Sequence, residues 1–230
     1  APALTVPGGS APLAYSWVKN SSNFMALNMP FNGHLSTSGL TKMSQDYSGN
    51  ANHGTLGTTA YYTTSGCKVN GCLLPDGQST GFVTVPNAAN LQITGDLTLG
   101  IWFKTAAIAG SYRDLIFKGS IGAANTVNYG LWLEGSPQLV KFVQYNSSGT
   151  LLVSFIAPTY PSALNTWYHV MAVRSGLTIT FYINGQYDGS AAITAGTPAT
   201  TTNDLCIGGG CVTTTLNGTI DEAVIFPAAL

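Results

Sequence analysis

An oxygen-rich segment near residue 50 is the first candidate for binding chemistry. Residues 46–54 read DYSGNANHG, which places Asp46, Asn50 and Asn52 within one short stretch. Calcium takes six to eight oxygen ligands from carboxylates, amides and backbone carbonyls. The segment therefore predicts a structural calcium ion bound by these side chains. The alternative is that they cap turns of their own segment through hydrogen bonds to the backbone.

Four cysteines form two short pairs in the sequence, and turn-forming residues lie between the members of each pair. A zinc site would usually show CxxC spacing or histidines nearby, and the spacing here is different. Of the three possible connectivities, the local disulfides Cys67–Cys72 and Cys206–Cys211 are the expected pairing, with free buried thiols as the alternative. Disulfides indicate an oxidising compartment, so we expect an extracellular or cell-surface protein.

Three Asn-x-Ser/Thr sequons agree with this location, at Asn20, Asn146 and Asn217. Each tripeptide is a candidate glycosylation site, although such tripeptides also arise by chance in a chain rich in Asn, Ser and Thr. Asn146 is the best candidate, because the residues around it are typical of an exposed hairpin turn.

Short β-strands are the elements expected to position these residues. Alternating apolar patterns separated by turn residues predict strands at 81–86, 97–104, 115–118, 129–134, 139–145, 151–156, 168–174, 178–184 and 221–226. Asn184-Gly185 between two of them predicts a type I′ hairpin turn. No segment has a 3.6-residue apolar period over ten or more residues, so we expect no long helix. The pattern is typical of an antiparallel sandwich.

Four segments, in a fixed order along the chain, carry a resemblance to a known family. They are DYSGNANHGTL at 46–56, WYHVMAVRSGLTITFYINGQ at 167–186, LCIGGG at 205–210 and LNGTIDEAVIF at 216–226. Together they resemble the laminin G-like jelly roll of the concanavalin A-like lectin/glucanase superfamily, as found in large microbial surface proteins. The resemblance implies an all-β, two-sheet antiparallel jelly-roll sandwich over residues 24–230. It also implies that the Asp46 segment lies beside the last strand, which adds Asp221 to the expected calcium ligands.

The glucanases of this superfamily use paired carboxylates on one strand, in an E-x-D-x-x-E pattern. A retaining mechanism needs two such groups about 5 Å apart. The nine acidic residues are Asp46, Asp76, Asp96, Asp114, Glu134, Asp188, Asp204, Asp221 and Glu222. None forms that pattern, and the adjacent Asp221 and Glu222 would point to opposite faces of a strand. We therefore expect no catalytic residues and no enzyme activity.

The first 23 residues form a separate unit in this interpretation, an extended arm with one extra strand at 13–20. Tyr15 and Trp17 in that strand would each cost about 2 kcal/mol if left in water. We expect the strand to dock on a neighbouring copy or module by strand addition. The alternative is that it packs on its own jelly roll.

Charged residues make up only 7% of the chain, and the net charge is −1. This charge excludes a large basic surface for nucleic acid or anionic lipid. No apolar run approaches the roughly 18 residues that insert into a membrane. A nearly uncharged surface favours self-association, so we expect partners among copies of the same assembly.

These observations lead to a main interpretation and an alternative. The main one is a non-catalytic extracellular structural or adhesion module, a repeat or subunit of a surface filament linked through its N-terminal arm. The alternative is a lectin-type module that binds glycans with aromatic faces and neighbouring polar groups. Trp102 and Trp132 lie in predicted strands, and the loop aromatics freer to face solvent are Tyr61, Tyr62, Tyr112 and Tyr160.

Overall fold

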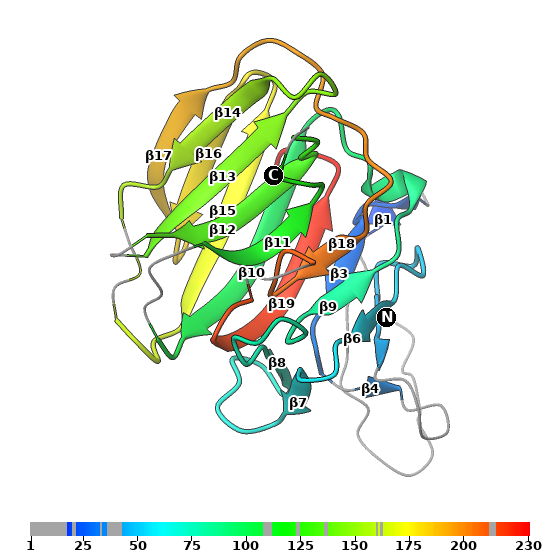
Figure 1. Cartoon of the computed structure of the whole chain (residues 1–230), viewed down its shortest axis with the longest axis vertical. Helices are drawn as coiled ribbons and strands as arrows, with labels where there is room; N and C mark the ends of the chain where they lie inside the picture. Colours follow the sequence, from blue (N-terminus) through cyan, green and yellow to red (C-terminus); the bar gives the residue numbers. More distant parts are fainter. Residues whose placement is uncertain are drawn as a thin grey trace.

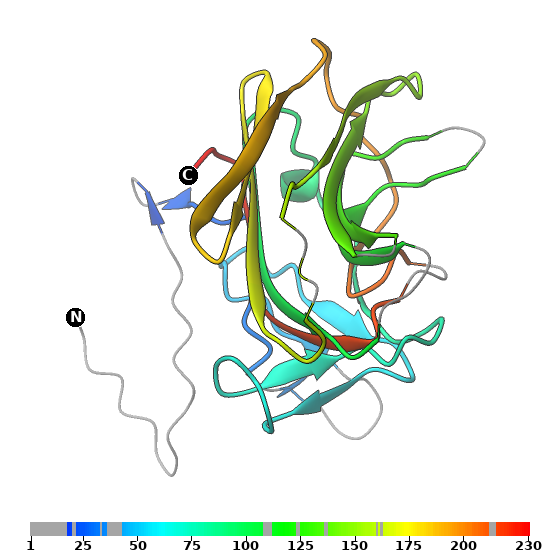
Figure 2. The ribbon, with the colours of Figure 1, turned by 90° about the vertical axis from the view of Figure 1, so that its left-hand side faces the viewer.

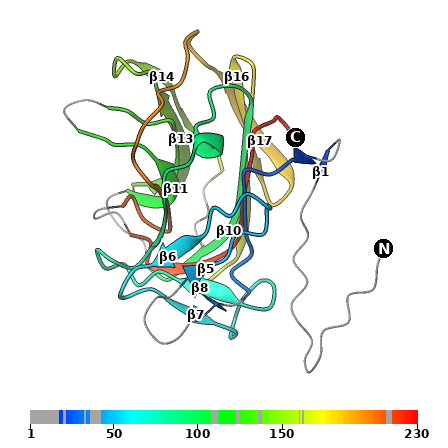
Figure 3. The ribbon, with the colours of Figure 1, turned by 90° about the vertical axis from the view of Figure 1, so that its right-hand side faces the viewer.

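The computed structural model describes residues 18–19, 22–32, 34–35, 43–107, 112–122, 125–135, 138–159, 161, 163–211 and 215–230. These residues form two antiparallel β-sheets that lie face to face as two layers (Figure 1, Figure 2). The all-β sandwich predicted from the strand pattern is confirmed, and its layers are seen from the opposite side in Figure 3.

Sheet 1 contains the last strand of the chain near its centre. Its order is β17 (Gln186–Ala192), β16 (Thr178–Ile183), β15 (Tyr168–Ser175), β10 (Leu97–Thr105), β19 (Gly218–Phe226), β8 (Cys72–Leu74) and β7 (Tyr61–Thr63). A further strand, β3 (Leu27–Met29), pairs with the second half of β19. The C-terminal segment is therefore held on both sides, by β10 and by β3 and β8.

Sheet 2 lies against sheet 1. Its order is β14 (Leu151–Ile156), β13 (Leu139–Tyr145), β12 (Tyr129–Glu134), β11 (Arg113–Lys118), β18 (Leu205–Ile207), β9 (Val83–Val85), β6 (Gly54–Leu56), β5 (Met43–Ser44) and β4 (His34–Leu35). The one helical turn in the described part of the chain is a 3₁₀ turn at Ala89–Leu91. Within the described residues, no helix is long and apolar enough to cross a bilayer.

The core lies between the two sheets and follows from alternation along the strands. In β10, Leu97, Leu99, Ile101 and Phe103 are almost completely buried and belong to one hydrophobic cluster with residues of sheet 2. Burying each such side chain contributes about 1.5–3 kcal/mol. Because successive strand residues point to opposite faces, the residues between them in β10 lie on the outer face of sheet 1.

The hairpin at Asn184-Gly185 shows how local sequence fixes strand pairing. Asn184 has φ of +50° and Gly185 has φ of +78°. Positive φ at both central residues is the requirement of a type I′ turn, whose twist matches that of the strands it joins. The turn joins β16 to β17 with Ile183 opposite Gln186, as predicted.

The N-terminal residues in the described part form a small hairpin apart from both sheets. Here β1 (Val18–Lys19) pairs with β2 (Ser22–Asn23) as a two-stranded sheet. Residues 1–17, with Tyr15 and Trp17, and Asn20 lie outside the described residues. The docking of this arm on a neighbour, and the division of the chain at residue 23, therefore stay predictions.

Candidate functional site

Asp46 is a buried carboxylate whose oxygens both accept hydrogen bonds from the protein. Its Oδ1 accepts from the amides of Asn28 and Ser48, each at 2.9 Å. Its Oδ2 accepts from the Ser48 hydroxyl at 2.7 Å and the Asn52 amide at 2.9 Å. A carboxylate offers about four lone-pair sites, so these four donors use its capacity.

The side chains of the neighbouring asparagines use their N–H groups, and not their oxygens, for contacts with the buried backbone. The Asn50 side-chain amide donates to the carbonyl of Met25 at 2.7 Å, and that of Asn52 donates to the carbonyl of Ala26 at 2.9 Å. A cation at this place would face N–H groups, and it would compete with them for Asp46. The arrangement fits the turn-capping alternative.

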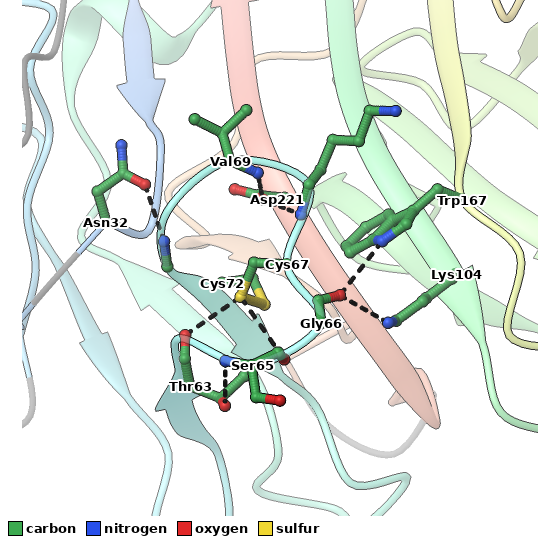
Figure 4. Close-up of a disulfide and its surroundings, with 12 residues drawn as sticks. Asn32, Thr63, Ser65, Gly66, Cys67, Val69, Cys72, Lys104, Trp167 and Asp221 are labelled. Atoms are coloured by element: carbon green, nitrogen blue, oxygen red, sulfur yellow. Dashed lines mark hydrogen bonds between the residues drawn. A yellow bond between two sulfur atoms is a disulfide. The ribbon is translucent and has the colours of Figure 1, made fainter.

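Asp221 lies in a different hydrogen-bonding environment from Asp46. It is fully buried under the loop between β7 and β8, where its Oδ2 accepts from the amides of Lys68 at 3.0 Å and Val69 at 2.9 Å (Figure 4). Its Oδ1 accepts from the amide of Glu222 at 2.9 Å. Burial raises the pKa of Asp221 to about 7, against the lowering effect of these amide donors.

No group of three or more His, Cys, Asp or Glu side chains suited to a metal occurs within the described ranges. Calcium bound by Asp46, Asn50, Asn52 and Asp221 stays a prediction, and these contacts give it no support. The expectation from the resemblance that Asp221 lies beside the Asp46 segment likewise stays a prediction.

Both disulfides have the local pairing expected from the sequence. Cys67 is joined to Cys72 and Cys206 to Cys211, with Cα–Cα distances of 5.4 and 5.5 Å. The first bond closes the loop over Asp221, and the second closes the loop after β18. Loops this small gain little from chain entropy, so their main effect is to hold loop shape.

The two sequons inside the described part differ in their surroundings. Asn146 is half-buried in the turn between β13 and β14, and its Oδ1 accepts from the amides of Ser148 and Thr150 at 3.0 and 2.8 Å. Asn217 is exposed and forms a backbone bridge with Asp76. Turn capping accounts for Asn146 and backbone pairing for Asn217, and glycosylation of both stays a prediction.

A pocket on the outer face of sheet 2 brings aromatic and polar side chains together. Its volume is about 390 Å³, and it is lined by Tyr112, Asp114, Phe117, Gly119, Ser120, Ile121, Trp132, Asn203, Gly210 and Cys211. We call it the Tyr112 pocket. Strands β11 and β12 supply its floor, and the loop held by the Cys206–Cys211 disulfide supplies part of its rim.

A break in the register of β11 is what places a carboxylate beside an aromatic floor. The pairing of β11 with β12 shifts between Asp114 and Ile116. Leu115 and Ile116 therefore both enter the core, while Asp114 and Phe117, three residues apart, both line the pocket. An extra residue of this kind in one strand redirects the side chains on either side of it.

The three aromatic rings of the pocket pack against one another. Tyr112 meets Trp132 edge-on with ring centroids 5.7 Å apart, and Phe117 lies 6.2 Å from Trp132. Trp132 is only 4% exposed, whereas Tyr112 is 46% exposed. Tyr112 is thus the ring available to a ligand, and the other two support it.

The sequence of this chain places it in a family. The model of the concanavalin A-like lectin/glucanases superfamily, in its laminin G form, matches residues 76–230. The chain belongs to this superfamily. The family predicted from the four ordered segments is thereby confirmed. Among curated proteins, none matches the sequence significantly.

Solved structures of the same fold include binding domains of several kinds. The binding domain of Paraclostridial Mosquitocidal Protein 1 has a TM-score of 0.68 at 14% identity, and the match covers 90% of this chain and 49% of that one. The botulinum neurotoxin serotype D ligand-binding domain, in complex with N-acetylneuraminic acid, has a TM-score of 0.66 at 14% identity. That match covers 90% of this chain and 48% of the toxin domain. This chain thus spans about half the length of the toxin domains.

A third structure matches over nearly its whole length. Domain 4 of AbnA, a GH43 extracellular arabinanase from Geobacillus stearothermophilus, in complex with arabinotriose, has a TM-score of 0.65 at 17% identity. The match covers 90% of this chain and 93% of that domain. At such identities the likeness concerns the fold.

Sequence reasoning found part of the pocket. Tyr112 was among the loop aromatics expected to face solvent, as was Tyr61, which is 51% exposed. Tyr62 is instead half-buried, and burial raises its pKa well above the usual range. Tyr160 lies outside the described residues. Asp114, Ser120 and Asn203 come from separate segments, and no spacing in the sequence links them as parts of one site.

Proposed function

We propose that this chain is a non-catalytic, extracellular carbohydrate-binding module and that the Tyr112 pocket holds the sugar. The observation that carries the proposal is the combination of a half-exposed tyrosine ring with a carboxylate and an amide in one hollow of about 390 Å³. A pyranose has an apolar face for the ring and hydroxyls for Asp114 and Asn203.

The chemistry of the pocket favours binding over hydrolysis. Of the residues that line it in the described part of the chain, Asp114 is the single carboxylate. Glycoside hydrolysis with retention or inversion uses a pair of them. The two disulfides support an oxidising, extracellular location. The neurotoxin serotype D domain in complex with N-acetylneuraminic acid and domain 4 of AbnA in complex with arabinotriose, which share this fold, lend further support.

Glycan-array screening of the intact chain, followed by calorimetry on the sugar found, tests this function. Tyr112→Ala and Asp114→Asn should each weaken binding at least about tenfold, equivalent to about 1.4 kcal/mol. Tyr187→Ala is the matched control, since Tyr187 is 64% exposed on β17 of the other sheet. Sugar binding that both pocket variants leave unchanged, or release of reducing sugar by the wild type, would contradict the proposal.

A further inference from the structure

A second group of side chains, on the outer face of sheet 1, combines cations with aromatic rings. Trp102 and Lys104 alternate in β10 with the core residues Ile101 and Phe103, so they point away from sheet 2. A hollow of about 430 Å³ at this place is lined by Lys68, Trp102, Trp167, His169, Asn184 and Gly185. We call Lys68, Trp102, Lys104, Trp167 and His169 the cationic patch.

Each lysine of the patch lies over an indole ring. The Lys68 ammonium is 4.1 Å from the ring centroid of Trp102, and that of Lys104 is 4.9 Å from the ring centroid of Trp167. Trp102 in turn lies beside His169 with centroids 4.9 Å apart. Cation–π contacts hold the ammonium groups at the surface while leaving their positive charge uncompensated.

Among the described residues, neither of these two lysines forms an ion pair with a carboxylate. The ion pair found among the described residues is Lys141 with Glu134 at 2.6 Å, on sheet 2. Lys104 donates to the carbonyl of Gly66 at 2.7 Å, a neutral acceptor. In a chain with only eight Lys and Arg, two ammonium groups without counter-ions beside two tryptophans form a local positive site.

Asp221, whose carboxylate lies beneath the loop that carries Lys68, is bound by backbone amides and not by the ammonium groups of the patch in the described contacts. It is buried beneath the loop, and its hydrogen bonds in the described part of the chain come from backbone amides. Its pKa, raised to about 7 by burial, keeps much of it protonated near neutral pH. Burial raises the pKa of the adjacent Glu222 as well, and burial together with Lys68 lowers the pKa of His169. The excess charge of the patch therefore comes from its lysines.

The Cys67–Cys72 loop fixes the position of Lys68 from several sides. The disulfide closes the loop, and the amides of Lys68 and Val69 are anchored on Asp221 (Figure 4). At the far end of the loop, the amide of Gly71 donates to Asn32 Oδ1 at 3.1 Å. A backbone held in this way loses little further freedom when a ligand binds.

The same loop organises the other half of the patch. The indole of Trp167 and the ammonium of Lys104 both donate to the carbonyl oxygen of Gly66, at 3.3 and 2.7 Å, and Figure 4 shows the two side chains converging on it. One loop thus sets the spacing of both lysines and of one tryptophan. This is a built arrangement rather than a chance accumulation of surface charge.

We propose that the cationic patch is a second binding site, for sugars that carry a carboxylate. The carboxylate pairs with Lys68 or Lys104, and the apolar face of the sugar ring lies against Trp102 or Trp167. A patch of two cations is far smaller than the surface that nucleic acid requires, and indoles add nothing to binding of a bare phosphate. The inference rests on contacts of its own and does not depend on the Tyr112 pocket.

Calorimetry with the intact, oxidised chain tests this site. The probes are trigalacturonate and 3′-sialyllactose, with the neutral galactose trimer and lactose as their uncharged counterparts. Binding of either acidic probe, with its neutral counterpart at least about tenfold weaker, is the expected result. The probe that binds identifies hexuronate or sialate as the source of the carboxylate. Absence of binding by both would overturn the proposal.

Variants locate the site. Lys68→Gln and Lys104→Gln should each weaken binding of the acidic probe about tenfold, while Lys68→Arg and Lys104→Arg keep it. Lys141→Gln removes the same charge from sheet 2 and should leave affinity unchanged. Equal affinity in wild type and both patch Gln variants would overturn the proposal, and so would equal loss in Lys141→Gln.

A second readout does not depend on changing the lysines. In ¹H–¹⁵N spectra the indole N–H signals of Trp102 and Trp167 should shift on addition of the acidic probe, and that of Trp132 should not. The double variant Cys67→Ser/Cys72→Ser, in which the other disulfide remains, should weaken binding at least about fivefold with its far-UV spectrum unchanged. Binding that shifts only the Trp132 signal would assign the acidic sugar to sheet 2 and refute the patch.

Discussion

Asp221 is a carboxylate that the fold keeps out of water, and among the described residues it forms no ion pair with a cation. Three backbone amides bind its oxygens, two of them from the disulfide loop. Desolvation is the dominant influence and raises its pKa from 3.8 to about 7. The side chain therefore anchors the loop. Burying it costs free energy when it is ionised, and much less when it is protonated.

This cost predicts how stability varies with pH. Below about pH 4 the side chain is protonated in both states. Between about pH 4 and 7 the unfolded chain releases the proton and the folded protein retains it, so the contribution of Asp221 to stability falls as pH rises. Asp221→Asn cannot ionise. The free energy of unfolding of the wild type, minus that of the variant, should therefore be largest near pH 4 and decrease toward pH 7.

Urea denaturation at several pH values measures this difference directly. Other groups with shifted pKa values, such as His169, are present in both proteins, so the comparison isolates Asp221 together with its coupling to Glu222. A difference that stays constant between pH 4 and 7, or that grows with pH, would show that Asp221 ionises normally.

Strand β12 illustrates how one element serves the core and the pocket at once. Leu131 and Leu133 enter the core, while Gly130 and Trp132 lie on the outer face. A Cβ added at Gly130 would lie 2.6 Å from the Trp132 ring and 3.3 Å from that of Phe117. The absence of a side chain at this position is what allows the two rings to pack beneath Tyr112.

Gly130→Ala should consequently destabilise the protein by about 1–3 kcal/mol, the usual cost of overpacking. It should also weaken sugar binding in the Tyr112 pocket, because Trp132 must move. Gly95→Ala is the matched control, since a Cβ there has no atom within 4 Å, and its effect should stay within about 0.5 kcal/mol. Chemical denaturation measures the free energy of unfolding of both variants, and calorimetry measures sugar binding by Gly130→Ala. Equal stabilities of the two variants would mean that the ring packing yields at no cost.

Across the whole molecule, the sequence predicts what depends on neighbouring residues. Alternation along residues 97–104 and the Asn184-Gly185 turn define β10 and the β16–β17 hairpin, because side-chain period and turn type are local properties. The hydrogen-bond donors to Asp46 could not be predicted in this way. One of them, the amide of Asn28, lies 18 residues away in the sequence, and only folding brings it to the carboxylate. The shift in β11 that joins Asp114 to the aromatic floor depends equally on pairing with β12.

The N-terminal arm bears on how the whole molecule behaves in solution. With a net charge of −1, copies of the chain meet little electrostatic repulsion. If Tyr15 and Trp17 bury their rings on a neighbouring copy, removing residues 1–17 should abolish self-association. The truncated protein keeps the β1–β2 hairpin and both sheets, so its glycan binding should be unchanged.

Sedimentation velocity over a range of concentrations measures this effect, with Tyr15→Ser/Trp17→Ser in the full chain as the matched variant. We expect assemblies of the full chain, and monomers of both the truncated protein and the double variant. If the arm docks on a neighbouring copy and not on its own jelly roll, the thermal unfolding of both should coincide with that of the full chain at low concentration. Identical sedimentation of all three proteins would exclude assembly through the arm.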